Sequence, residues 1–162
     1  TGRIQEILGK VVGLIQTSSA VVPKGSTFSI SHHYGIDSFE KTGIVLIDCI
    51  NREYCKKLLV LMPGQAHPFH YHKHKEETFL ILYGEMDVTC DDKLRHVKKG
   101  DTVVVERGVN HAFKSDTGCV FEEISTTHYV DDSYYEDEES FTSPRKTLVY
   151  LTDEMMHTLG IG

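Results

Sequence analysis

The sequence has no tryptophan, and only four prolines and four cysteines among its 162 residues. No apolar run approaches the roughly 20 residues that a membrane-spanning helix needs. The N-terminus also lacks a basic segment followed by an apolar core, which is the pattern of a secretory signal. We therefore expect a cytoplasmic protein that has no membrane as a partner.

Basic residues are also in the minority. The 17 Lys and Arg residues are outnumbered by 24 Asp and Glu residues, which gives a formal net charge of -7. No stretch rich in Lys and Arg offsets this charge, and a negative protein repels the phosphate backbone of nucleic acids. We therefore expect no nucleic-acid partner.

The few cysteines are widely spaced and form no C-x-x-C pair. Most of them sit in apolar, strand-like runs, where a reduced thiol packs as a small hydrophobic group. Disulfides are rare in reducing compartments. We therefore expect free, structural thiols at Cys49, Cys55, Cys90 and Cys119.

A change of periodicity near residue 25 divides the chain. Apolar residues recur at helical spacing over 4–15, which predicts one amphipathic helix there. A Pro-Lys-Gly sequence at 23–25 then breaks the chain. We assign 1–25 to an N-terminal helical segment and 26–162 to a single domain, for which the length is sufficient.

Beyond residue 25 the chain consists of short runs rich in Val, Ile, Leu, Thr and Phe, separated by Gly, Asp and Asn, which is typical of strands. So many short strands at close spacing predict an all-β fold, an antiparallel barrel such as a jelly roll. The acidic segment 131–139 is interpreted as a solvated loop, and Thr152 as the cap of a short C-terminal helix. The predicted strands are 27–31, 43–50, 56–62, 69–72, 78–83, 86–90, 94–98, 102–106, 111–114, 119–125 and 146–151.

Histidines are concentrated just before one of these strands. Residues two apart in a strand project from the same face, so His70 and His72 can direct both imidazoles at one point. Glu77 follows five residues later and supplies a carboxylate. Neutral imidazole together with carboxylate suits a divalent transition metal such as Mn, Zn, Fe, Co or Ni. For an isolated H-x-H pair, the alternative is two surface histidines.

Two spaced motifs favour the metal site. Residues 64–84 fit G-x5-H-x-H-x4-E-x6-G, and residues 100–111 fit G-x7-G-x2-H. In these motifs the sequence resembles the cupin superfamily, whose members place them on neighbouring strands of a small barrel. The resemblance implies a double-stranded β-helix, or jelly roll, with four metal ligands. It departs from the family pattern at Glu106, where cupins usually have proline. The implied ligands are His70, His72, Glu77 and His111.

Four protein ligands leave two positions open on an octahedral ion, where a vicinal hydroxy-carbonyl of an open-chain sugar can bind. Aldose-ketose isomerisation then needs an acid and a base nearby. Lys75 lies between two of the ligands, and of the adjacent Glu122 and Glu123 one should point into the barrel. The alternatives are a solvated loop amine and a structural, hydrogen-bonded carboxylate. An ion nearby would lower the pKa of Lys75.

A closer resemblance concerns the catalytic pair. The segments Pro63-Gly64-Gln65, His70-x-His72-x-x-Lys75-x-Glu77 and Glu123-Ile124-Ser125-Thr126 are similar to blocks of D-lyxose isomerase-type cupins. The resemblance implies acid and base roles for Lys75 and Glu123, with a carbohydrate as the small-molecule partner. The chain is shorter than that type between His111 and Glu123, which leaves the substrate open.

Further polar residues are candidates for substrate binding. His67 flanks the implied ligands in the sequence. It either lines the mouth of the barrel or is exposed to solvent. His128 and Tyr129 follow a strand, and a polar cluster beside a strand end is a candidate for ligand contact; the pair His32-His33 is a similar cluster. We name His67, His128 and Tyr129 as substrate-binding candidates.

A second resemblance covers most of the chain. The segments 31–43, 50–58, 67–79 and 121–138 are similar to the cupin domain appended to some bacterial N-acetylneuraminate synthase family proteins. It implies a role in nonulosonic acid or surface-polysaccharide synthesis, and a start at Thr1 fits fusion to a synthase domain. We favour a sugar isomerase or epimerase. The alternatives are a non-catalytic carbohydrate-binding or regulatory domain and an iron-dependent dioxygenase. We also expect a homodimer, because open sheet edges invite exchange between two copies.

Overall fold

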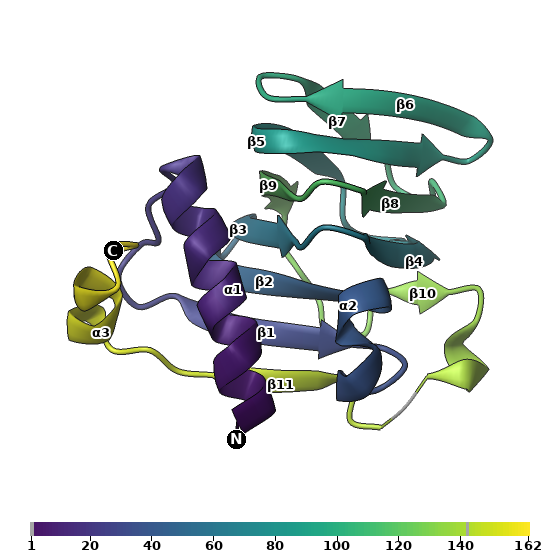
Figure 1. The fold of residues 1–162 in the computed structure, drawn as a ribbon. Coiled ribbons are helices and arrows are strands. Elements are labelled where there is room, and N and C mark those ends of the chain that lie inside the picture. Colours follow the sequence, from purple (N-terminus) through teal and green to yellow (C-terminus); the bar gives the residue numbers. More distant parts are fainter. Residues whose placement is uncertain (1, 142) are drawn as a thin grey trace.

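A computed structural model describes residues 2–141 and 143–162 (Figure 1). Two antiparallel sheets form the body of the molecule. One sheet has the order β11-β1-β2-β3-β9-β5-β7, and the other has the order β10-β4-β8-β5-β6. The strands are β1 (Thr27–His32), β2 (Gly43–Asn51), β3 (Tyr54–Leu61), β4 (Gln65–Tyr71), β5 (Glu77–Cys90), β6 (Lys93–Lys98), β7 (Thr102–Val105), β8 (His111–Ser115), β9 (Cys119–Thr126), β10 (Tyr134–Tyr135) and β11 (Lys146–Val149).

The interior of the barrel follows from alternation along the strands. In β3, Leu59 and Leu61 belong to a buried cluster between the sheets, whereas Leu58 and Val60 belong to a second cluster on the outer face. In β9, Phe121 lies in the inner cluster. Since side chains two apart share a face, Glu123 of the same strand also points inward. Apolar side chains therefore fill most of the interior of the barrel, and polar side chains point inward at one end of it.

Helices cover the outer face of the first sheet. Figure 1 shows α1 (Gly2–Ser18) lying across β1, β2 and β3. Its apolar residues Ile7, Val11 and Ile15 are buried in the outer cluster. The short helices are α2 (Phe39–Thr42), α3 (Asp153–Thr158), and the 3-10 turns η1 (Ile36–Ser38) and η2 (Glu138–Ser140). None of the described helices is both long enough and apolar enough to cross a membrane.

Most of the predicted elements are confirmed. The all-β barrel is present, the Thr152 side chain caps α3 by accepting a hydrogen bond from the Met155 N–H at 3.1 Å, and the four cysteines are free. The predicted helix over 4–15 begins and ends farther out, at Gly2–Ser18. The prediction missed α2, whose single turn has too few residues for a periodic signal.

Two predictions about strands and loops are wrong. The separate strands 78–83 and 86–90 are one continuous strand, β5, because Gly84 adopts a left-handed conformation (φ 76°) that lets the strand bend from one sheet into the other. The acidic segment 131–139 is not a uniformly solvated loop. It contains β10, which pairs with β4, and its Asp132 is buried.

Candidate metal centre

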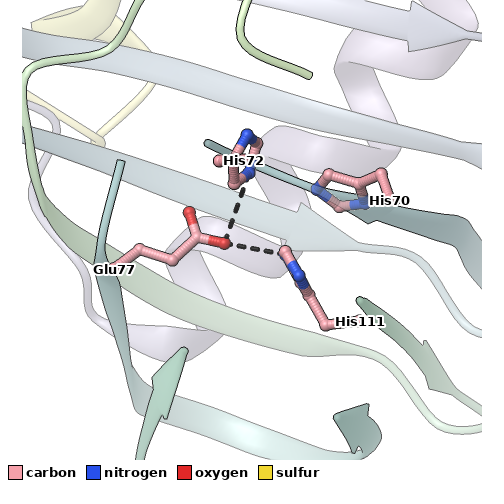
Figure 2. Close-up of side chains that lie close together, drawn as sticks. All are labelled: His70, His72, Glu77 and His111. Atoms are coloured by element: carbon pink, nitrogen blue, oxygen red, sulfur yellow. Dashed lines mark ion pairs between the residues drawn. The ribbon is translucent and has the colours of Figure 1, made fainter. Parts of the chain in front are cut away.

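The four predicted ligands converge at one end of the barrel (Figure 2). His70 lies near the end of β4 and His72 just after it, while Glu77 opens β5 and His111 opens β8. Strand pairing places His70 directly opposite His111. One ligand atom from each residue lies within 4.8 Å of all the others, and all four residues are buried. The structure therefore brings together every residue that the two motifs imply as a ligand.

Backbone carbonyl groups fix the orientation of the three imidazoles. The carbonyl oxygens lie 3.1, 2.7 and 3.0 Å from Nδ1 of His70, His72 and His111. An Nδ1–H group that donates to a carbonyl leaves Nε2 without a proton, which is the state in which imidazole binds a metal. The carbonyl groups belong to Pro68, Asp132 and Val109.

The polar atoms at the centre fit a cation. Nε2 of His111 lies 2.8 Å and Nε2 of His72 lies 3.6 Å from the same Glu77 oxygen, Oε1. Among the described residues, Nε2 of His111 has no hydrogen-bonding partner. Two buried acceptors this close are favourable only with a proton or a metal ion between them. Three imidazoles and one carboxylate are donors that suit Mn, Zn, Fe, Co or Ni.

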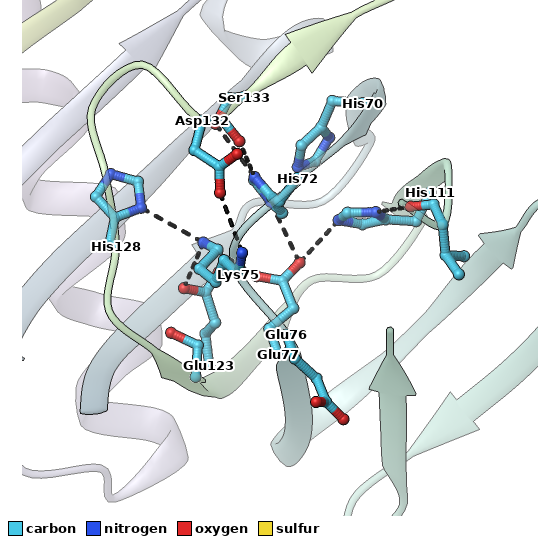
Figure 3. Close-up of polar contacts among 12 residues, drawn as sticks. His70, His72, Lys75, Glu76, Glu77, His111, Glu123, His128, Asp132 and Ser133 are labelled. Carbon is cyan, nitrogen blue, oxygen red and sulfur yellow. Dashed lines mark hydrogen bonds and ion pairs between the residues drawn. The ribbon is translucent and has the colours of Figure 1, made fainter. Parts of the chain in front are cut away.

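A buried ion-pair chain lies beside the ligands (Figure 3). The Lys75 ammonium is 3.1 Å from Oε2 of Glu77 and 3.2 Å from Oε2 of Glu123. All three side chains are buried. Glu122 faces the other way and pairs with Lys56 at 3.1 Å. Glu123 is thus the inward-pointing member of the adjacent pair.

These charges shift one another's pKa values. Burial lowers the pKa of Lys75, but the carboxylates of Glu123 and Glu77 outweigh burial and raise it. Burial likewise raises the pKa of Glu77, but Lys75 and, after it, the neighbouring His111 bring it well below its usual range. The pKa of Glu123 is raised, first by burial and then by Glu77. The expected lowering of the Lys75 pKa is therefore not found in the protein alone, because two carboxylates contact its ammonium.

The turn that carries His72 and Lys75 is held by Asp132, which the sequence analysis did not single out. The Asp132 carboxylate accepts hydrogen bonds from the backbone N–H groups of Lys73 at 2.8 Å, His74 at 3.0 Å and Lys75 at 3.1 Å. Its backbone carbonyl also accepts the Nδ1–H of His72. The residue therefore supports the ligand turn through both its side chain and its main chain.

The structure brings two of the three substrate-binding candidates to the centre. His67 is buried, and its ring lies 4.6 Å from that of His70. His128 approaches the Lys75 ammonium with Nδ1 at 3.5 Å, and burial, followed by Lys57 and Lys75, lowers its pKa to about 3. Both line the pocket over the ligands. Tyr129 is half-exposed and is absent from that lining.

The pocket over the ligands adjoins a larger cleft with a volume of about 650 Å³. Lys57, His128, Ser133, Tyr135 and Lys146 line both spaces. A cleft of this size is in the range of small-molecule sites, which is about 300–1,000 Å³. Lys57 and Lys146 were not singled out from the sequence, although the alternation of β3 places Lys57 on the same face as Leu59.

Comparison with known proteins finds one matching family. Residues 57–124 match the family model described as the cupin domain, a range that includes all four candidate ligands. This part of the chain is therefore similar to the cupin domain, and the fold built around it is of the cupin type. The resemblance seen in the two motifs is confirmed.

Similar proteins include sugar isomerases. The D-lyxose/D-mannose isomerase of Thermosediminibacter oceani is 33% identical over 92 residues, which cover 52% of this chain and 51% of that protein. The match thus spans about half of this curated relative. The L-ribose isomerase of Geodermatophilus obscurus has a similar fold, with a TM-score of 0.70 at 16% identity over 85% of this chain and 92% of that one. The Cellulomonas parahominis L-ribose isomerase without ligand gives a TM-score of 0.71 at 17% identity over 88% and 94%.

Proposed function

We propose that this protein is a metal-dependent sugar isomerase, which interconverts an aldose and a ketose, free or phosphorylated, or else a sugar epimerase. The observation that carries the proposal is the buried pair of Lys75 and Glu123, whose charged atoms are 3.2 Å apart and lie beside the ligand Glu77. A buried ion pair costs desolvation energy and is weak evidence for stability. An acid and a base next to a metal centre are what isomerisation requires.

The ligands His70, His72, Glu77 and His111 would hold a divalent metal, which when bound polarises the carbonyl and neighbouring hydroxyl of an open-chain sugar. The remaining chemistry belongs to the chain. The Glu123 carboxylate takes the proton from C2 and returns it to C1, while a proton passes from the C2 oxygen to the C1 oxygen. Lys75 donates to the oxygens on which negative charge develops. Substrate and product are isomers, so no oxidant or reductant is consumed.

The comparisons support carbohydrate as the substrate class. The curated relative at 33% identity is named for isomerisation of D-lyxose and D-mannose. The likeness of four segments to the cupin domain of N-acetylneuraminate synthase family proteins supports a setting in bacterial nonulosonic acid or surface-polysaccharide metabolism. In that setting we expect a homodimer or a domain fused to a synthase.

The decisive experiment uses NMR to measure the exchange of carbon-bound protons with deuterated water, at C2 of an aldose and at C1 of a ketose. Protein loaded with Mn²⁺ is incubated with aldoses, ketoses and their phosphates, and we expect exchange together with aldose-ketose conversion. Glu123→Gln should abolish both while the metal stays bound. The matched control is Glu122→Gln, which removes a carboxylate from the opposite face of the same strand.

The alternative is a non-catalytic carbohydrate-binding or regulatory domain. It predicts sugar binding to the loaded protein with no exchange in the wild type. That result, obtained across aldoses, ketoses and phosphates, would overturn the isomerase proposal.

A further inference from the structure

Positive side chains line the cleft beside the candidate metal centre. Lys57, Arg145 and Lys146 line it, and we call these three residues the cationic rim. Asp48 is the only carboxylate among the described residues of the lining. The protein as a whole carries a net charge of -7, so this excess of positive charge is local.

The fold places the rim on the inner side of the barrel. Lys57 shares a face of β3 with Leu59 and Leu61 of the inner cluster, and its side chain is only 6% exposed. Lys146 opens β11, where it pairs with Ser31 of β1. Ser31 in turn pairs with Ile44, a member of the inner cluster, and residues directly opposite in a sheet share a face. Lys146 therefore also projects toward the interior side.

Internal partners neutralise the rim only in part. Lys57 pairs with Asp48 at 3.5 Å, but the Asp48 side chain is 45% exposed. Arg145 lies 3.7 Å from Glu138, and its buried Nη1 has no hydrogen-bonding partner among the described residues. No ion pair joins Lys146 to any carboxylate of residues 2–141 and 143–162. Donors thus remain available in the cleft.

Neighbouring groups respond to this positive charge. Burial, followed by Arg145 and Lys146, lowers the pKa of His33 to about 4. The Lys146 ammonium sits in the cleft, where desolvation, and then Lys57, lowers its pKa. Like charges held together without enough counter-charge repel one another. An anion bound among them would relieve that repulsion.

We propose that the cationic rim binds an anionic group of the substrate, a phosphate ester or a carboxylate, on a sugar whose reacting carbons lie at the metal centre. This inference rests on the proposed function, since it assigns the substrate class of the same site. The guanidinium of Arg145 offers paired donors suited to phosphate or carboxylate, and the two lysines add point charges. Tyr135 and Ser133 in the same lining add neutral hydroxyl groups.

The test compares D-mannose, D-mannose 6-phosphate and D-mannuronate by calorimetric binding to the Mn²⁺-loaded chain, with C2-proton exchange as a separate readout. We expect one of the two anionic sugars to bind about tenfold or more tightly than D-mannose, because a hydrogen bond to a charged group contributes about one such factor. The preferred anion separates phosphate from carboxylate recognition. The preference should shrink as salt concentration rises.

Variants locate the effect. Lys146→Gln and Arg145→Gln should each reduce the ratio of anionic to neutral affinity about fivefold or more. The control Lys99→Gln removes the same charge from an exposed turn and should leave the ratio unchanged. Thermal melting verifies that each variant is folded.

Two outcomes would overturn the rim proposal: equal or undetectable binding of all three sugars, or an anion preference that survives in both variants. Failure of the proposed function has a different signature, namely selective binding of an anionic sugar without exchange at C2. The two proposals can therefore fail separately.

Discussion

The backbone carbonyl of Asp132 lies 2.7 Å from Nδ1 of His72, so a residue of the C-terminal part of the chain sets the orientation of a candidate metal ligand. Its carboxylate also holds the backbone of the turn that follows His72. Outer partners of this kind commonly decide how well a centre binds its metal.

Replacing Asp132 by alanine keeps the backbone carbonyl but removes the carboxylate that holds the turn, and should weaken metal binding about 10-fold to 100-fold, the usual cost of losing an outer contact. It should also lower the free energy of unfolding by roughly 1–3 kcal/mol, because N–H groups of the turn lose their acceptor. Titration calorimetry with Mn²⁺ and urea unfolding measure the two effects. Asp131→Ala, at the exposed neighbouring position, is the control. Equal metal affinity in both variants would show that the turn needs no support from Asp132.

Metal should stabilise the fold through its ligands. An ion that binds only the folded state adds about 2.7 kcal/mol at a concentration 100 times its dissociation constant. We expect a chelator to lower the melting temperature and added Mn²⁺ or Zn²⁺ to restore it. His111→Ala should lose this response, whereas His96→Ala, at an exposed histidine of β6, should keep it. A wild-type melting temperature that changes with neither chelator nor added metal would argue against a metal centre.

Two glycines of the first cupin motif should differ in their tolerance of alanine. Both have positive φ, 87° at Gly64 and 76° at Gly84. At Gly64 no atom lies within 4 Å of an added Cβ, so we expect only the cost of the left-handed conformation, about 1–2 kcal/mol. At Gly84 the Cβ would lie 2.1 Å from the Gly118 carbonyl oxygen. Gly84→Ala should therefore lose several kcal/mol more, on the order of 3 or above, in urea unfolding. Similar losses at both sites would contradict the role of the close approach.

Stability should fall in mild acid, in part through His33. The pKa of His33 is about 4 in the folded protein, against 6.5 for the free side chain. Between these two pH values the unfolded chain therefore binds more protons than the folded one. The contribution of His33 to the free energy of unfolding is fully present above pH 6.5 and is lost as the pH falls toward 4. By pH 5 the loss is roughly 2 kcal/mol. Urea midpoints at pH 7.5 and 5 should differ less in His33→Gln than in the wild type. His157→Gln, at an exposed histidine, is the control. An equal pH dependence in His33→Gln and the wild type would refute the prediction.

The barrel and the ligand set could be read from the sequence because their signals are local. Alternation marks each strand, and the spacing of His70, His72 and Glu77 within eight residues places them on adjoining strand ends. The inward direction of one glutamate at 122–123 also followed from alternation. The resemblance singled out Glu123, and the structure shows that Glu123 is the residue that points inward.

The supporting residues could not be read in this way. Asp132 lies in an acidic segment whose composition indicates solvent exposure, and its role depends on a contact with a turn almost 60 residues earlier. Lys57 follows another lysine, Lys56, in β3, and its interior position depends on which face of that strand the barrel encloses. Long-range packing, rather than local pattern, decides both.

The sequence separation of 60 residues between His72 and Asp132 links the centre to the order of synthesis. A nascent chain that has emerged through β8 already carries all four candidate ligands, yet not the segment that fixes their turn. We therefore expect full-strength metal binding only after Asp132 has been synthesised. A chain truncated before Asp132 would contain all four candidate ligands but would lack the residue that holds the turn after His72.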